Sequence, residues 1–453
     1  MFNKILIANR GEIALRIIKT LKRMGIGSVA AYSEPDRHLR FVQEADESVP
    51  LGGERASESY LLQEKILNAA KKTSADGIHP GYGFLSENAA FAQAVIDSQL
   101  KFIGPTPKTI SAMGDKGKAL EIMSSAGMPT LPRFSVENKT EAQCLQHAES
   151  MGYPVLVKAQ FGGGGIGMGL VGDAKRLISS ISKVQDAAKR NFGKGDVYVE
   201  KFLKNAKHIE FQVAGDKNGQ IRCLGARECS VQRRHQKIIE ETPSPLQIRD
   251  PMALHEIQEQ ILKVLATIGY GNVGTVEMLA CEGQFYFLEM NTRLQVEHRI
   301  TEMVTGHDIV EIQMRIADGQ TLDEILGSEK SENFDGGHAI EFRICAEDPV
   351  SFLPSPGTIE KYEEPQGDGI LVDSGFRAGD VITPYYDSLI AKLVIHGPNR
   401  SVALARAYEA LTRFHIEGIN HNIPFHLNVL SQEQFLSGEY DTKFVESLGG
   451  LTK

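Results

Sequence analysis

The sequence lacks the features of a membrane-spanning, secreted or disulfide-stabilised protein. No apolar run in its 453 residues approaches the ~20 residues that a membrane helix needs. The apolar stretch near the N-terminus, Ile5 to Ala8, is too short for a signal peptide. The five cysteines are odd in number, and no two are spaced as Cys-x-x-Cys. We therefore expect neither a disulfide framework nor a zinc site, and we expect a cytoplasmic location.

The chain also has fewer basic than acidic residues. Lys and Arg number 49 against 58 Asp and Glu, which gives a formal net charge of −9. Proteins that bind nucleic acid or anionic membranes present basic surfaces, so we expect neither partner. The composition, 42% hydrophobic and 24% charged, is typical of a globular enzyme. At ~150 residues per domain, the length predicts about three domains.

The first portion, residues 1–112, has the pattern of an α/β fold. Short apolar strands separated by helical spacing are expected at residues 4–8, 28–32, 77–79 and 101–103. Repeated strand–helix–strand units form a doubly wound parallel sheet, which binds ligands at the carboxyl ends of its strands. The segments Asn9–Glu12 and His79–Tyr82 lie at such ends.

The pattern changes after residue 112 to one that mixes helices with longer strands, as in α+β domains. A helix from Lys116 to Ala126 leads into a compact stretch, 130–203, with its own strands and a glycine loop. Alternating strands of antiparallel type follow at residues 208–214, 220–227, 273–281 and 285–290. We predict a second domain over 113–320 and a third over 335–445.

The glycine loop is a candidate phosphate site. A strand over 155–159 runs into four consecutive glycines, residues 162–165, and a second apolar run follows. Consecutive glycines permit positive φ, and their N–H groups can surround phosphate oxygens. A strand follows the loop rather than a helix, so it is neither a Walker loop nor a dinucleotide fingerprint. Lys158 at its mouth favours a phosphate-binding flap over a flexible hairpin without a ligand.

Two apolar strands joined by a short turn form the strongest pattern in the chain. A three-residue turn, Glu282 to Gln284, would pair Cys281 with Phe285 and place Glu277 opposite Glu289. The two carboxylates would then lie ~5 Å apart, which is destabilising unless a cation sits between them. Mg²⁺, which prefers oxygen ligands, is the natural candidate.

Polar residues continue at every second position after this hairpin. They are Glu289, Asn291, Arg293, Gln295 and Glu297. If the segment stays extended, all five project to one face. The alternative is a half-exposed strand with a solvated polar face.

Basic residues cluster between Arg227 and Lys237. In an acidic protein this cluster is either a focused anion site or a charged surface loop, and alone the second interpretation is favoured. Arg343 lies on an alternating strand, where an arginine by itself more often forms a structural ion pair.

Taken together, these segments resemble the biotin carboxylases, the ATP-grasp components of biotin-dependent carboxylases such as acetyl-CoA carboxylase. The resemblance spans the whole chain. Its carriers are residues 7–14 (IANRGEIA), 79–88 (HPGYGFLSEN), the glycine flap, 232–237 (QRRHQK) and 289–298 (EMNTRLQVEH). It implies an ATP-grasp fold, with an N-terminal Rossmann-like domain over 1–112, a mobile lid over 130–203 within 113–320, and a C-terminal biotin carboxylase domain over 335–445.

The resemblance also implies a reaction. Bicarbonate attacks the γ-phosphate of ATP to give carboxyphosphate, and a ureido nitrogen of biotin on a carrier protein is then carboxylated. The implied nucleotide-binding residues are Lys116, Lys158, Gly164, Gly165, Glu200, Lys201, Leu203, His208 and His235. Glu277, Glu289 and Asn291 would hold Mg²⁺ or Mn²⁺. Bicarbonate would bind Lys237, Arg293, Gln295 and Val296, with Glu297 as its general base, and Arg343 would stabilise the biotin enolate.

Partners follow from the same resemblance. The chain carries no Met-Lys-Met biotinylation motif, so a biotin carboxyl carrier protein and a carboxyltransferase are expected as separate partners. The family is commonly a homodimer. The final acceptor stays open: acetyl-CoA or another acyl-CoA, pyruvate, or a urea-like compound.

Two positions depart from the usual family pattern. Ile166 replaces an arginine that is usual in acetyl-CoA carboxylase members and is similar to the urea carboxylase branch, while Arg299 replaces a usual proline. Two other functions remain as alternatives: another ATP-grasp ligase, including a carbamoyl-phosphate-type enzyme, and a non-catalytic nucleotide sensor. The first would not need Arg293, Gln295 and Glu297 together with Arg343. The second would not need an intact set of phosphate and metal residues.

Overall fold

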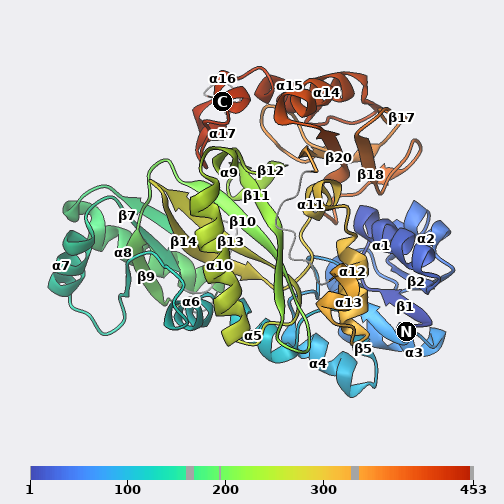
Figure 1. The fold of residues 1–453 in the computed structure, drawn as a ribbon, viewed down its shortest axis with the longest axis horizontal. Coiled ribbons are helices and arrows are strands. Elements are labelled where there is room, and N and C mark those ends of the chain that lie inside the picture. Colours follow the sequence, from blue (N-terminus) through green and yellow to red (C-terminus); the bar gives the residue numbers. More distant parts are fainter. Residues whose placement is uncertain (1, 160–167, 193–194, 328–335, 449–453) are drawn as a thin grey trace.

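The computed structural model describes residues 2–159, 168–192, 195–327 and 336–448. Figure 1 shows the N-terminal part in blue beside the orange helix α12 (Ile309–Ala317), the strands of residues 207–242 in green, and the C-terminal part in orange to red above them. Helices α7 (Glu141–Met151) and α8 (Ala174–Phe192) and the strands beside them project away from this body. No helix formed by the described residues is long and apolar enough to cross a membrane.

The N-terminal part is built on a five-stranded parallel sheet in the order β3-β2-β1-β4-β5. Its strands are β1 (Lys4–Ile7), β2 (Gly27–Tyr32), β3 (Glu47–Pro50), β4 (Gly77–His79) and β5 (Lys101–Phe102), and its longer helices are α1 (Gly11–Met24), α3 (Gln63–Thr73) and α4 (Ala89–Asp97). The strand order reverses between β1 and β4, which is where such sheets form a ligand crevice. The predicted doubly wound sheet is confirmed. Strand β3, an edge strand with one buried side chain, was not predicted from the sequence.

The two segments expected at strand ends meet in this crevice. Asn9, which follows β1, donates from its side chain to the carbonyls of Pro80 (2.8 Å) and Tyr82 (2.7 Å), which follow β4. The Asn9 side chain therefore holds the turn after β4 in place.

Residues 130–203 form a small separate sheet in the order β6-β9-β7-β8. Its elements are β6 (Arg133–Ser135), α7 (Glu141–Met151), β7 (Val155–Ala159), β8 (Met168–Val171), α8 (Ala174–Phe192) and β9 (Val197–Lys201). Strands β7 and β8 are antiparallel, with Val157 opposite Gly169, so a strand does follow the glycine loop. The loop itself, including Gly164, Gly165 and Ile166, lies outside the described residues.

The central sheet has eight strands in the order β14-β13-β10-β11-β12-β15-β20-β18. They are β10 (Lys207–Gly215), β11 (Ile221–Arg233), β12 (Gln236–Thr242), β13 (Asn272–Cys281), β14 (Gln284–Asn291), β15 (His338–Cys345), β18 (Ile370–Ser374) and β20 (Leu389–Gly397). All neighbouring pairs are antiparallel, as predicted for the four strands expected in residues 208–290. Because β12 pairs with β15, the sheet continues from the second predicted domain into the third. The domain boundaries stay a prediction.

The chain also forms further α-helices and strands. They are α2 (Arg40–Glu44), α5 (Pro107–Gly114), α6 (Lys116–Ser125), α9 (Pro245–Arg249), α10 (Pro251–Thr267), α11 (His298–Thr305), α12 (Ile309–Ala317), α13 (Leu322–Leu326), β16 (Gly357–Thr358), β17 (Lys361–Glu363), β19 (Val381–Ile382), α14 (Arg400–Arg413), β21 (His415–Glu417), α15 (Ile423–Val429), α16 (Glu433–Ser437) and α17 (Phe444–Ser447).

The two faces of the central sheet differ in polarity. Phe211 and Val276 belong to an apolar core formed with α10 and α6, which pack on one face. Side chains alternate along a strand, so Glu210 and Glu277 point to the other face, although both are buried. The apolar face packs the strands against the core, and the buried charged face of the same strands carries the functional groups.

Arg16 ties the N-terminal part to the central part. Its side chain, 4% exposed on α1, lies 2.8 Å from Glu302 on α11 and 2.9 Å from Asp308 before α12. Burial acts to raise the pKa of Asp308, but Arg16 lowers it to about 2. Asp308 therefore contributes stability above its unfolded pKa of ~3.9, and this contribution is lost as pH falls toward 2.

We predict that Arg16→Leu lowers the free energy of unfolding by about 3–5 kcal/mol at pH 7, because it leaves two carboxylates without their buried partner. The control is Arg23→Leu. Arg23 also contacts Asp308, at 2.7 Å, but is 55% exposed, so the loss should stay below about 1 kcal/mol. Urea denaturation followed by circular dichroism compares them. Equal losses in the two variants would contradict the role given to Arg16.

Candidate active site

One large cavity opens between the small sheet, the charged face of the central sheet, and the N- and C-terminal parts. Its volume is about 1190 Å³. The predicted site residues that line it are Lys116, Lys158, Glu200, Lys201, Leu203, His208, His235, Lys237, Glu277, Glu289, Asn291, Arg293, Gln295, Val296 and Arg343. Glu297 is fully buried next to Lys237 and Arg343, and Gly164 and Gly165 lie outside the described residues.

The hairpin of β13 and β14 places Glu277 opposite Glu289, as predicted, but by another route. The turn has two residues, Glu282 and Gly283, both with positive φ, and Cys281 pairs with Gln284. The predicted three-residue turn and the pairing of Cys281 with Phe285 are therefore wrong. A two-residue turn of this kind matches the strand twist, and a β-bulge beyond Glu277 restores the register by one extra residue.

The polar residues after this hairpin converge without remaining extended. Strand β14 ends at Asn291, and Glu297 stands in a turn directly before α11. The condition that the segment stays extended through Glu297 is therefore not met, because the chain turns to begin the helix. The side-chain amides of Asn291 and Gln295 donate to Glu277 Oε1, at 2.8 and 3.1 Å. Arg293 in turn donates to the side-chain oxygens of Asn291 and Gln295, at 2.9 Å each.

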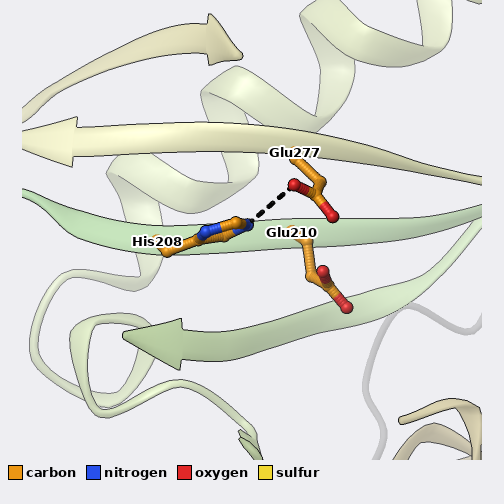
Figure 2. Close-up of side chains that lie close together, drawn as sticks. All are labelled: His208, Glu210 and Glu277. Atoms are coloured by element: carbon orange, nitrogen blue, oxygen red, sulfur yellow. Dashed lines mark ion pairs between the residues drawn. The ribbon is translucent and has the colours of Figure 1, made fainter. Parts of the chain in front are cut away.

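Lys237 is the electrostatic centre of the site. Its ammonium lies 2.8 Å from Glu277 and 2.7 Å from Glu297 and also contacts Glu210. Figure 2 shows Glu210 and Glu277 projecting from neighbouring strands, with His208 Nε2 3.1 Å from Glu277. Burial acts to raise the pKa of Glu277, but Lys237 and His208 hold it well below its usual range.

Glu297 lies between two cations. One carboxylate oxygen contacts Lys237, and the other lies 3.1 Å from Arg343. Burial opposes ionisation, yet Lys237, Arg343 and Arg227 hold the pKa of Glu297 well below its ordinary value. The side chain is therefore an anion at neutral pH, able to accept a proton.

A second group of charges lies nearer the small sheet. Lys116 pairs with Glu289 at 2.9 Å, and Lys158 contacts Glu200. His235 has φ of 65° in the turn between β11 and β12, and this turn brings it to the cavity wall. These cations and the carboxylates beside them form the part of the cavity suited to a polyphosphate and its metal.

The basic cluster proves to be two different features. Arg227 is fully buried and donates to Glu210, to Gln212 at 2.8 Å and to Thr301 at 2.9 Å, so it is not part of a surface loop. Arg233, Arg234, His235 and Lys237 line the cavity. The interpretation as a charged surface loop holds only for the turn between β11 and β12, where Arg234 and His235 are exposed.

Arg299 occupies the second position of α11. It contacts Glu302 and lies 2.7 Å from Asp373 on β18. The arginine thus fits the helix and links it to the C-terminal part.

Comparison with known proteins matches this geometry. Family models match over residues 1–110 (biotin carboxylase, N-terminal domain), 115–325 (carbamoyl-phosphate synthase L chain, ATP binding domain) and 341–447 (biotin carboxylase C-terminal domain). The chain is 46% identical to biotin carboxylase of a Nostoc species over 99% of both chains. The chain belongs to the biotin carboxylase family.

Other relatives are similar over most or all of their length. A pyruvate carboxylase subunit of Methanothermobacter thermautotrophicus is 45% identical over 98% of this chain and 90% of its own. The Campylobacter jejuni biotin carboxylase in its β,γ-ATP complex has a TM-score of 0.93 at 41% identity, covering 99% of both chains. The biotin carboxylase domain dimer of Hydrogenobacter thermophilus 2-oxoglutarate carboxylase, with MgADP, ADP and bicarbonate, gives 0.92 at 43%, covering 100% of this chain and 98% of that one.

Membership of the family makes the chain an ATP-dependent ligase that uses ATP and Mg²⁺, with an ATP-grasp fold as expected. The donors of the hairpin fit such a metal: Glu277, Glu289 and Asn291 offer the oxygen ligands that Mg²⁺ prefers. Among the described residues, His208, Glu210 and Glu277 also bring ligand atoms within 4.8 Å of one another.

Sequence reasoning missed two charged residues of the biotin carboxylase site, Glu210 and Glu240, and named Arg227 only as part of the basic cluster. Glu210 lies opposite Glu277 in the ladder of β10 and β13, and Arg227 lies opposite Glu210 in that of β10 and β11. Alternation within 208–214 indicated a polar face, but the pairing of strands far apart in the chain was needed to place it.

We predict that Lys237→Met destabilises the fold by about 3–5 kcal/mol at pH 7, because three buried carboxylates lose their shared cation. Glu277 and Glu297 have lowered pKa values in the folded state. Their stabilisation is present above the unfolded pKa of ~4.3 and declines below it, so the gap to wild type should narrow toward pH 4.

Urea denaturation at pH 7 and pH 4 measures that gap. Lys118→Met is the matched control, since Lys118 is 68% exposed and 3.9 Å from its partner, and it should change stability little at either pH. A gap for Lys237→Met that is constant with pH would show that the carboxylates do not depend on this cation.

Proposed function

We propose that this chain carboxylates biotin carried on a separate protein, using ATP and bicarbonate through carboxyphosphate. The observation that carries the proposal is the placement of Glu297 between Lys237 and Arg343, beside the carboxylate hairpin. Phosphoryl transfer needs a metal and positioned cations, and bicarbonate needs a base, and this arrangement supplies both.

The nucleotide is bound by the cations of the cavity. Lys116, Lys158, His208 and His235 approach its phosphates, and Glu200, Lys201 and Leu203 meet the adenine. Glu277, Glu289 and Asn291 hold Mg²⁺, which neutralises phosphate charge when bound. Gly164 and Gly165 contribute backbone N–H groups to the phosphates in this proposal, because glycines permit close approach.

Bicarbonate binds against Lys237, Arg293, Gln295 and the backbone of Val296. Its O–H proton passes to Glu297, and the freed oxygen attacks the γ-phosphorus of ATP, releasing ADP and forming carboxyphosphate. When Lys237 turns to the bound anion, Glu297 loses part of the interaction that lowers its pKa and becomes a stronger base.

The second step takes place on the Arg343 side. Carboxyphosphate decomposes to CO₂ and phosphate. The released phosphate takes the N–H proton of a ureido nitrogen of biotin, and this nitrogen attacks CO₂. Arg343 stabilises the negative charge that develops on the ureido oxygen, which is the role of a preorganised cation at a developing oxyanion.

The partners and the acceptor extend this proposal. A biotin carboxyl carrier protein delivers biotin, a carboxyltransferase uses the product, and two copies of the chain form a homodimer, as in the Hydrogenobacter domain. We propose an acetyl-CoA or other acyl-CoA acceptor, with pyruvate as second candidate because one similar protein belongs to a pyruvate carboxylase. Five free thiols favour a cytoplasmic location.

The first prediction from this mechanism is that ATP hydrolysis depends on bicarbonate and rises further with free biotin. The attacking oxygen belongs to bicarbonate, so without it the γ-phosphate has no positioned nucleophile. Phosphate release is measured with each substrate omitted in turn. Equal rates with and without bicarbonate would remove the carboxylase proposal in favour of another ATP-grasp activity.

The second prediction separates the two steps. Glu297→Gln should lower bicarbonate-dependent ATP cleavage by ~10²–10⁴, the usual contribution of a general base. Arg343→Ala should impair carboxybiotin formation more than ATP cleavage, because its charge acts on biotin. Phosphate release and carboxybiotin are measured in parallel.

Matched controls for this comparison lie on α14. Glu409→Gln and Arg413→Ala change an ion pair of 3.6 Å whose members are 71% and 52% exposed, and they should alter neither product. If both products fell equally in Arg343→Ala, the assignment of Arg343 to the biotin step would be wrong.

A further inference from the structure

Two buried glutamates face each other behind Arg343. Glu240 on β12 lies opposite Glu341 on β15 in the antiparallel register, and both are fully buried. Side chains two apart on a strand share a face, so Glu341 and Arg343 point the same way. The pair stands beside the site already described, and the reaction steps above use neither glutamate.

The hydrogen bonds of this pair are incomplete. Arg343 donates from Nε to Glu240 Oε1 at 2.7 Å. Glu240 Oε2 and both carboxylate oxygens of Glu341 are buried and have no hydrogen-bond partner among the described residues. A buried polar atom of this kind normally has one. Three acceptor atoms without a donor, on two carboxylates in register, indicate a missing proton donor.

A second carboxylate pair in the same sheet provides a contrast. Glu228 lies opposite Glu241 between β11 and β12, but these oxygens are satisfied by serine hydroxyls, Arg400, His338 and Tyr440. Burial opposes ionisation of Glu241, yet its partners lower its pKa to about 2. That pair has cations and hydroxyl donors, whereas the pair behind Arg343 has one arginine.

We propose that Glu240 and Glu341 share one proton, with Glu341 as the acid donating to Glu240 Oε2, and that the pair positions the Arg343 guanidinium toward Glu297 and the cavity. The proposal rests on the role given to Arg343 in the biotin step. Glu240 is then a positioning residue. Because Glu341 holds the proton, no second negative charge lies beside Glu240 without a cation to compensate it.

The charges around the pair support one proton at neutral pH. Burial raises the pKa of Glu341 well above its ordinary value, with Lys392 opposing and Glu240 adding to the rise. Burial also raises the pKa of Glu240 to about 7, against the attraction of Arg343. Two like charges this close and this buried do not both ionise.

Lys392, Lys237 and Tyr82 all bind groups other than Glu240 and Glu341. Lys392 on β20 lies 3.1 Å from Glu12 on α1 and donates to the carbonyl of Val296 at 3.0 Å. Lys237 contacts three other carboxylates, and Tyr82 donates to Glu12. If Glu341 lost its proton, its carboxylate would compete with Glu297 for Arg343 and draw the guanidinium away from the cavity.

The direct test is infrared spectroscopy of the ligand-free enzyme at neutral pH. We expect a carbonyl stretching band of a protonated carboxyl group that Glu341→Gln removes and Glu409→Gln, a change at an exposed carboxylate, leaves in place. A band unaffected by Glu341→Gln would overturn the proposal. Glu341→Met, which also lacks the acid, repeats the test if the glutamine variant does not fold. This readout needs no activity, so it stands apart from the proposed function.

The kinetic test uses the pH dependence of carboxybiotin formation. In the wild type the KM for biotin should rise on the alkaline side as the shared proton is lost. Glu341→Gln should keep at least half of the wild-type rate of carboxybiotin formation at pH 7, because its amide donates to Glu240 as the acid does. The alkaline rise in the KM for biotin should be lost in this variant. Glu240→Gln should raise the KM for biotin about tenfold at pH 7, as expected when one hydrogen bond to a charged group is weakened.

Two kinetic outcomes would contradict the proposal. One is an unchanged alkaline rise in Glu341→Gln, which would assign the ionisation to another group. The other is a fall in kcat with an unchanged KM for biotin in Glu240→Gln, which would separate Glu240 from the placing of Arg343. Loss of bicarbonate dependence in the wild type would instead contradict the proposed function and leave the infrared result standing.

Discussion

The pairing of Lys237 with three buried carboxylates is the interaction on which the charged face of the central sheet depends. Carboxylates from β10, β13 and the turn before α11 meet at this one ammonium. Without a cation there, their mutual repulsion and their burial would both oppose folding. Lys237 also lowers the pKa of Glu297, so an anion that binds Lys237 would make Glu297 a stronger base.

The opposite face of the same strands explains how such a charged layer can be buried. Phe211 and Val276 anchor the sheet on the apolar core beneath α10 and α6. That hydrophobic layer fixes the strands, and the strands then hold charged side chains in place without help from solvent. Glu210, Lys237, Glu277, Glu289 and Arg343 lie on strands, so this part of the site is preorganised by the sheet.

Several parts of this arrangement were predictable from the sequence, for identifiable reasons. The parallel sheet, the strand after the glycine loop and the opposition of Glu277 to Glu289 all follow from local patterns. The predicted turn of the hairpin was one residue too long. Glu277 still pairs with Glu289, because a β-bulge compensates for the difference. Glu210 and Glu240 were missed, and Arg227 was named only as part of the basic cluster, because their roles depend on strand pairings far apart in the chain, which periodicity alone does not specify.

The ladder that joins β12 to β15 also sets a scale for the chemistry. Strands β13 and β15, which carry Glu277 and Arg343, are four steps apart in the central sheet, about 19 Å at ~4.8 Å a step. Only long side chains reach across such a span, which accounts for the glutamates, glutamine, lysine and arginines that meet over its middle. The sheet therefore keeps the part of the cavity at Glu277 and the part at Arg343 at a constant separation.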